Sequence, residues 1–249
     1  MISHRIGSVD VSSGSYADIV AMLEEIATAS TAIHVHFVNA YVIALAEQDK
    51  DYGRLLATGL CLTDGTPVAW FGRWAYRQTA SEWERVYGPD VMASLLASAG
   101  LRHYLLGGTE QTLAALQVEI AKRWPQAQIV GAYSPPFRAL TEGEQAEQDA
   151  AIVASGADVV WVGLGTPKQD WEAARVAAST GLMTLAVGAA FDFIAGTKPQ
   201  APVWMQRSGT EWAFRLATEP RRLAKRYLWG NPRFLRAVAR QPGLRRSRD

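Results

Sequence analysis

Asp64 is the first residue whose type and position could support catalysis. It follows the short apolar run Gly59–Thr63 and precedes Gly65-Thr66-Pro67, a sequence typical of a helix start. We expect Asp64 at the carboxyl end of a buried strand, where desolvation raises the pKa of a carboxyl group toward that of a usable base. Capping of the following helix by Asp64 or Thr66 is the alternative.

Asp192 is a second carboxylate that could face a ligand. It lies between Phe191 and Phe193, just after Gly188. Two aromatic rings around one acid are typical of a base or sugar pocket, and a turn within the core is the alternative.

The remaining polar residues show no strong metal or nucleophile motif. Asp49-Lys50-Asp51 matches the Asp-x-Asp pattern of metal-dependent sugar transferases, but it lies in a polar stretch away from any expected strand end, so we interpret it as a solvated charge run. The four histidines lack metal-ligand spacing, and the single Cys61 excludes an intrachain disulfide. No Gly-x-Ser-x-Gly or Cys/His pair indicates covalent catalysis. These residues therefore offer no clear metal site.

The stretch Ala157–Asp170 is the clearest junction between a strand and a helix. Val159–Val162 is an apolar run that suits a strand buried on both faces. Thr166 is expected to cap the next helix, with Pro167 in its first turn and Gln169 completing a capping box. Helix-start amides suit an anion, but Pro167 removes one donor. We interpret this loop as one wall of a ligand site.

Several junctions of this kind recur along the chain, and they indicate one ligand site. The expected strands are 32–38, 59–63, 103–106, 128–133, 159–162 and 183–187, with a further strand at 5–11. Helices of ten or more residues separate most of them, which favours parallel pairing. Polar or glycine residues follow the strands at Asn39, Asp64-Gly65, Gly107-Gly108, Gly163–Thr166 and Gly188. Because ligands bind at the carboxyl ends of parallel strands, we expect a nucleotide-sized site there.

The C-terminal part of the chain is strongly basic. From Arg207 onward there are twelve basic and three acidic residues, a net charge of +9, whereas the preceding chain carries −8. Helices are expected at 202–208, 210–218 and 221–229, with Arg215, Arg222 and Arg226 on one face. We divide the chain into an α/β domain, 1–198, and a basic helical appendage, 199–249. The appendage is expected to bind an anionic membrane surface, and no nucleic-acid-reading motif appears.

The start of the sequence shows no sign of export. Residues 1–10 lack the apolar segment of a secretory signal, and no stretch approaches the roughly 20 apolar residues that span a bilayer. We expect a cytoplasmic protein that is soluble or peripheral to a membrane.

Eight ordered sequence blocks span about residues 33–227. They are Val38-Asn39-Ala40, Thr63-Asp64-Gly65, Glu84-Arg85-Val86-x-Gly88-x-Asp90-x-Met92, Leu106-Gly107-Gly108, Gly163-Leu164-Gly165-x-Pro167-Lys168-Gln169-Asp170, Gly188-x-x-Phe191-Asp192-Phe193-x-Ala195-Gly196, Ala201-Pro202-x-Trp204-Met205 and Glu219-Pro220-x-Arg222-Leu223. Together these blocks resemble glycosyltransferase family 26, the bacterial N-acetylmannosaminyl-, N-acetylmannosaminuronyl- and glucosyltransferases of cell-surface polysaccharide assembly.

The resemblance implies a Rossmann-like parallel-sheet fold with helices on both faces and an inverting, metal-independent sugar transferase. It would move a hexose or N-acetylhexosamine-type sugar from a UDP-sugar to a saccharide on undecaprenyl diphosphate, at the inner face of the cytoplasmic membrane. Asp64 would be the catalytic base, and Arg215, Arg222 and Arg226 would form a lid over the diphosphate. The nucleotide-sugar-binding residues would be Asn39, Arg85, Gly107, Gly108, Gly163, Gly165, Lys168, Gln169, Gly188 and Asp192.

One position departs from the family pattern. Many members carry Thr two residues before the Asn, where this chain has Phe37. The sequence leaves the donor sugar and any homo-oligomeric state open. A non-catalytic, membrane-docked nucleotide-binding scaffold of a polysaccharide assembly complex is the alternative function. A nicotinamide-dependent oxidoreductase would need the GxGxxG motif that is missing here.

Overall fold

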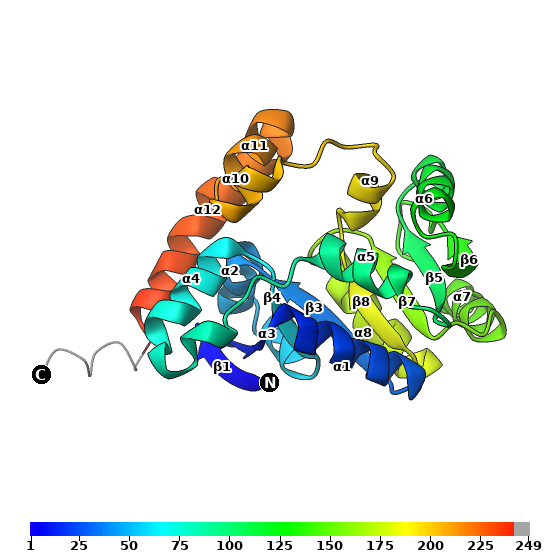
Figure 1. Ribbon diagram of the computed structural model, residues 1–249, viewed down its shortest axis with the longest axis horizontal. Helices are drawn as coiled ribbons and strands as arrows, with labels where there is room; N and C mark the ends of the chain where they lie inside the picture. The colour runs from blue at the N-terminus through cyan, green and yellow to red at the C-terminus, as the bar shows by residue number, and fades with distance from the viewer. Residues whose placement is uncertain (242–249) are drawn as a thin grey trace, which may run out of the picture. The chain divides into compact units, whose positions relative to one another are not determined.

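The computed structural model describes residues 1–241 and divides the chain into two compact units (Figure 1). Unit 1 consists of Met1–Tyr16, Phe37–Tyr87 and the described residues from Pro199 onward, and unit 2 of Ala17–His36 and Gly88–Lys198. The chain alternates between strands and helices in both units, and nearly all strand pairs are parallel. The expected α/β, Rossmann-like class is confirmed.

Unit 1 is built on a short sheet with the strand order β1-β2-β4-β3. Its strands are β1 (Ile2–Ile6), β2 (Val9–Ser13), β4 (Leu60–Thr63) and the end of β3 (Ile33–Val38). Its helices are α2 (Ala40–Gln48), α3 (Lys50–Ala57), α4 (Thr66–Ala75), the 3-10 helix η1 (Arg77–Glu82), α10 (Val203–Arg207), α11 (Glu211–Thr218) and α12 (Pro220–Ala239). The single strand expected at 5–11 is wrong, because Gly7, with φ of +58°, turns the chain into an antiparallel hairpin.

The long helix α12 belongs to the core of unit 1. Phe234, Ala237 and Val238 are buried in the same cluster as residues of β1, β2 and α2. Gly230 permits the close approach, since a Cβ there would lie 3.1 Å from the Tyr41 Cδ2. The helical tail therefore does not end near residue 229 as expected but continues to Ala239. No helix within residues 1–241 is long and apolar enough to span a bilayer.

Unit 2 contains the strands in the order β3-β8-β7-β5-β6, all parallel. They are the start of β3, β5 (Arg102–Gly107), β6 (Gln128–Tyr133), β7 (Val159–Gly163) and β8 (Met183–Ala186). The helices are α1 (Tyr16–Thr28, of which Tyr16 belongs to unit 1), α5 (Gly88–Ala97), α6 (Glu110–Arg123), α7 (Glu142–Ala154), α8 (Lys168–Thr180) and α9 (Ala190–Ile194). Residues 159–162 are all buried, so β7 is covered on both faces as expected.

Gly107 is required by a close approach of two strand ends in unit 2. Its φ is +117°, and it is paired with Gly163 in the β5–β7 register. A Cβ at position 107 would lie 2.8 Å from the carbonyl carbon and oxygen of Gly163. An alanine at position 107 therefore adds a steric clash with main-chain atoms to the strain of positive φ.

Gly107→Ala should lower the free energy of unfolding by about 3 kcal/mol, from overpacking and backbone strain together. Gly165→Ala is the matched control, because Gly165 also has positive φ (+79°), but a Cβ there would meet no atom of the described residues within 4 Å. We expect a loss of only about 1–2 kcal/mol there. Urea denaturation measures both, and equal losses would contradict the close-approach explanation.

Candidate active site

Asp64 and Asn39 lie side by side at the carboxyl ends of β4 and β3. The Asp64 amide donates to the Val38 carbonyl at 3.0 Å, and a Cβ on Gly65 would lie 3.0 Å from the Asn39 Cβ. The Asn39 side-chain oxygen caps α2 by accepting from the amides of Tyr41 and Val42. Its Nδ2 then donates to the Asp64 Oδ2 at 3.4 Å. The cap thus fixes the amide that contacts the carboxylate.

Arg85 connects this junction to the C-terminal helices. Its Nε donates to the Asp64 main-chain oxygen at 2.8 Å, and its Nη2 donates to Glu211 Oε2 at 2.6 Å. The guanidinium carbon also lies 4.0 Å from the centre of the Tyr87 ring, and the Tyr87 hydroxyl donates to Glu211 Oε1 at 3.1 Å. Both Glu211 oxygens are therefore held, and α11 is attached to the segment that follows β4.

The charges in this cluster raise the pKa values of Arg85 and Tyr87. Burial by itself lowers the pKa of Arg85, but the carboxylates of Asp64 and Glu211 outweigh that effect and raise it. Burial raises the pKa of Tyr87, and the nearby Glu211 and Asp64 raise it further. Arg85 stays a cation and Tyr87 a neutral hydrogen-bond donor across the physiological pH range.

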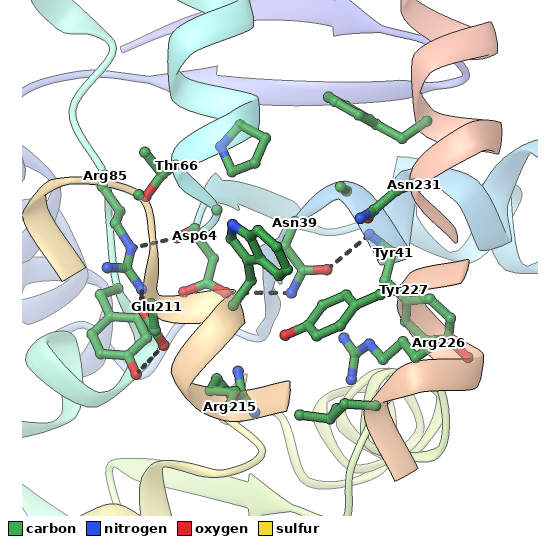
Figure 2. Close-up of a pocket in the computed structure, with 18 of the residues that line it drawn as sticks. Asn39, Tyr41, Asp64, Thr66, Arg85, Glu211, Arg215, Arg226, Tyr227 and Asn231 are labelled. Carbon is green, nitrogen blue, oxygen red and sulfur yellow. Dashed lines mark hydrogen bonds and ion pairs between the residues drawn. The ribbon is translucent and has the colours of Figure 1, made fainter. Parts of the chain in front are cut away.

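These residues line a cavity of about 310 Å³ that lies wholly within unit 1 (Figure 2). Asp64 and Asn39 line it from the sheet side, and Arg215 and Arg226 line it from α11 and α12. The Arg226 guanidinium lies 4.0 Å from the centre of the Tyr41 ring. The other lining residues are Ala40, Tyr41, Gly65, Thr66, Pro67, Arg85, Tyr87, Gly209, Glu211, Trp212, Leu223, Tyr227, Asn231, Phe234 and Leu235.

The structure brings together five of the site residues predicted from the sequence: Asn39, Asp64, Arg85, Arg215 and Arg226. The side chain of Arg222 lies outside the described side chains, although its backbone is part of α12. Phe37, two residues before Asn39, is buried.

Sequence reasoning missed Glu211, Tyr87 and the aromatic wall formed by Tyr41, Trp212 and Tyr227. Glu211 left one signal, because it is one of only three acids in the basic tail. The sequence contains no signal for Tyr41, because an aromatic residue in the first turn of a helix usually packs against a neighbouring element and does not mark a ligand site.

The predicted glycine-rich residues lie in unit 2, at the ends of β5, β7 and β8. The amide of Gly108 donates to the Gly163 carbonyl at 3.1 Å. A Cβ on Gly163 would lie 2.6 Å from the Phe191 ring, and one on Gly188 would lie 2.8 Å from Gln169 Oε1. The Gly188 amide donates to the Val162 carbonyl at 3.4 Å, so Gly107, Gly108, Gly163, Gly188 and Gln169 are neighbours. Close contacts require glycine at positions 107 and 163, whereas the atom next to Gly188 is the end of the flexible Gln169 side chain.

The capping box expected at Thr166 is wrong. Helix α8 begins at Lys168 with Pro167 at the N-cap and no side-chain cap. Gln169 has other partners: its Oε1 accepts from the Gly165 amide at 3.0 Å, and its Nε2 donates to the Ala186 carbonyl at 2.8 Å. Its buried amide joins the loop to β8 instead of capping the helix.

The two charged residues predicted in unit 2 make local contacts. Lys168 is exposed, and its Nζ lies 5.4 Å from the centre of the Phe137 ring. Asp192 is paired with Lys198 at 2.6 Å and accepts from the Thr197 hydroxyl at 3.2 Å. These contacts stabilise the turn after α9 (Figure 1).

The remaining polar motifs have structural partners. Asp49 caps α3 by accepting from the amides of Asp51 and Tyr52, and Asp51 is paired with Arg54. Buried His36 contacts Asp170 at 2.8 Å, and His103 accepts from the Trp161 indole at 3.2 Å. Across residues 1–241, no group of three or more His, Cys, Asp or Glu side chains is arranged to hold a metal ion.

Comparison with protein families gives one match over nearly the whole chain. The model of the Glycosyl transferase WecG/TagA/CpsF family matches residues 4–249. The matched range contains both units and every residue of the cavity. The resemblance drawn from the eight sequence blocks is thereby confirmed.

Proposed function

Because the chain belongs to the WecG/TagA/CpsF family of glycosyl transferases, which act in cell-surface polysaccharide synthesis, we propose that the unit 1 cavity is its active site. The substrates are a UDP-sugar, which donates a hexose or N-acetylhexosamine-type sugar, and a saccharide on undecaprenyl diphosphate. The observation that carries the proposal is the position of Asp64, a carboxylate at a strand end in a cavity that also contains arginines.

In this proposal Asp64 is the general base of a single displacement. It takes the proton from an acceptor hydroxyl as the oxygen attacks the anomeric carbon of the donor, and the bond from that carbon to UDP breaks with both electrons leaving on the diphosphate. One displacement inverts the anomeric configuration. A positioned base contributes roughly 10²- to 10⁴-fold to the rate. The Nδ2 of Asn39 donates to the Asp64 carboxylate, and the Nε of Arg85 fixes the Asp64 main chain for this step.

The arginines of the C-terminal helices stabilise the leaving UDP without a metal. Arg215 and Arg226 line the cavity beside Asp64. Hydrogen bonds from guanidinium groups to phosphate oxygens contribute about 1.5–3 kcal/mol each, and they develop as negative charge moves onto the leaving group. Arg222 remains a predicted part of the lid over the diphosphate. The unit 2 residues remain predicted contacts of the nucleotide-sugar.

The basic tail places the enzyme at the membrane. The segment from residue 199 onward, which contributes Arg215 and Arg226 to the cavity, also acts as the membrane-associating part of the chain, peripheral on the inner face of the cytoplasmic membrane. The support is the net charge of +9 from Arg207 onward, since each Lys or Arg near an anionic membrane contributes about 1 kcal/mol. The appendage is best tested by point variants, because deleting it also removes Phe234, Ala237 and Val238 from the core.

A panel of donors tests the proposed activity. The chain is incubated with UDP-glucose, UDP-glucuronate, UDP-N-acetylmannosamine or UDP-N-acetylglucosamine, with and without a short-chain lipid-diphosphate saccharide. We expect UDP release with one donor, and only when the acceptor is present. Binding of UDP with no release under any combination would favour the non-catalytic scaffold instead.

A further inference from the structure

Helix α4 of unit 1 exposes tryptophan and arginine side chains on one face. Trp70 and Trp74 are 52% and 56% exposed, and Arg73 between them is also exposed while its Nε donates to the Trp83 carbonyl at 3.0 Å. The spacing of i, i+3 and i+4 places all three on the same side of the helix. The opposite face is buried, and a Cβ on Gly72 would lie 2.1 Å from the Trp83 ring. The exposed side is therefore fixed by packing.

The chemistry of this face matches an anionic lipid surface. A tryptophan ring is amphipathic and favours the boundary between headgroups and acyl chains, and arginine is attracted to lipid phosphates. Helix α4 contains no acidic residue, and exposed Arg77 lies two residues after its last residue, Ala75, at the start of η1. A surface that combines exposed indole rings with cations and lacks acids is typical of an interfacial segment.

The face continues onto the C-terminal helices of the same unit. Trp70 lies against Gly209, where a Cβ would be 2.8 Å from its ring. Gly209 connects α10 to α11, which expose Val203, Trp204 and Trp212 to 59%, 66% and 50%. The only acid in those two helices is Glu211, which is buried against Arg85.

This surface also adjoins the cavity. Thr66 and Pro67, in the first turn of α4, line the cavity, and so does the exposed Trp212. Figure 2 shows Thr66 above Asp64. A bilayer bound to α4 and to the tryptophans of α10 and α11 would thus lie next to the cavity that contains Asp64, the proposed base for the acceptor hydroxyl.

We propose that Trp70, Arg73, Trp74 and Arg77, together with Val203, Trp204 and Trp212, form a docking face for an anionic phospholipid bilayer. The proposed function places membrane binding in residues 199–249 alone, and this inference adds a helix of the α/β body. It rests on the membrane part of the proposed function and not on the transfer chemistry.

Vesicle sedimentation of the full chain tests the docking face. The vesicles are mixtures of phosphatidylglycerol and phosphatidylcholine, with phosphatidylcholine alone as the uncharged control. Trp74→Ser should weaken binding at least about fivefold, because its ring is removed from the interface. Arg77→Gln should weaken it by about fivefold, and only on the charged vesicles. Trp171→Ser, at a 43% exposed tryptophan of unit 2, is the matched control and should bind as the unaltered chain does.

Turnover on a short, water-soluble acceptor separates this inference from the proposed activity. Trp74 and Arg77 do not line the cavity, so both variants should retain it. Unchanged vesicle binding by Trp74→Ser and Arg77→Gln would overturn the docking face and leave the tail as the sole anchor. A change in self-association caused by Trp74→Ser, with vesicle binding intact, would also overturn it, in favour of a contact between copies of the chain.

Discussion

Asp64→Asn should lower kcat at least about a hundredfold while leaving the fold intact. The amide has nearly the same shape as the carboxylate but cannot accept the proton of an attacking hydroxyl. The backbone contacts of position 64, to the Val38 carbonyl and from the Arg85 Nε, do not involve the side chain and persist in the variant. Steady-state turnover with the identified donor and a lipid-diphosphate saccharide measures the effect.

Asp192→Asn is the matched control for this substitution. Asp192 is the second carboxylate that the sequence places near a ligand, and the structure pairs it with Lys198. Because Asp192 remains a predicted contact of the nucleotide and not a base, Asp192→Asn should leave kcat within about threefold of the unaltered chain, and any loss should appear as a raised KM for the donor. A large loss of kcat in Asp192→Asn, with little loss in Asp64→Asn, would contradict the assignment of Asp64 as the base.

Glu211→Ala should lower the free energy of unfolding by about 3 kcal/mol and reduce turnover as well. The Glu211 and Arg85 side chains are only 11% and 20% exposed, and removal of one partner leaves the other charge poorly solvated. The substitution also removes the acceptor of the Tyr87 hydroxyl. Because Glu211 attaches α11 to the catalytic junction, Arg215 on the same helix should lose its fixed position.

A double-mutant cycle with Arg85→Ala separates the ion pair from simple loss of packing. The coupling energy between positions 85 and 211 should exceed about 1 kcal/mol, as expected for a hydrogen-bonded pair of charges with little exposure. Tyr87→Phe removes one hydrogen bond to the Glu211 carboxylate and leaves the ion pair in place, so it should cost about 1.5–3 kcal/mol. Additive effects of Arg85→Ala and Glu211→Ala would show that the pair does not attach α11.

The parallel core was predictable because its signals are local. The run Val159–Val162 is buried on both faces as its composition indicates, and strands at 102–107, 128–133 and 183–186 lie close to their expected positions. The side-by-side placement of Asn39 and Asp64 also follows from local signals, since each directly follows a strand and those strands are neighbours in the sheet.

The parts that sequence reasoning missed depend on distant partners. Arg85 and Glu211 are 126 residues apart in the chain, and no local pattern marks them as a pair. Helix α12 continues through Pro232 because Phe234, Ala237 and Val238 are buried in the unit 1 core, and this packing outweighs the cost of proline within a helix. The predicted capping box at Thr166 is wrong for the same reason. The side chain of Gln169, in α8, donates to the carbonyl of Ala186 in β8 and does not cap the helix.

The anomeric configuration of the transferred sugar, measured by NMR on the product, tests the central claim most directly. With the identified UDP-sugar and a short-chain lipid-diphosphate saccharide, the unaltered chain should add one sugar with inverted configuration. Asp64→Asn should form that product at least about a hundredfold more slowly. Retained configuration, or product formation by Asp64→Asn at the unaltered rate, would contradict a single displacement with Asp64 as its base.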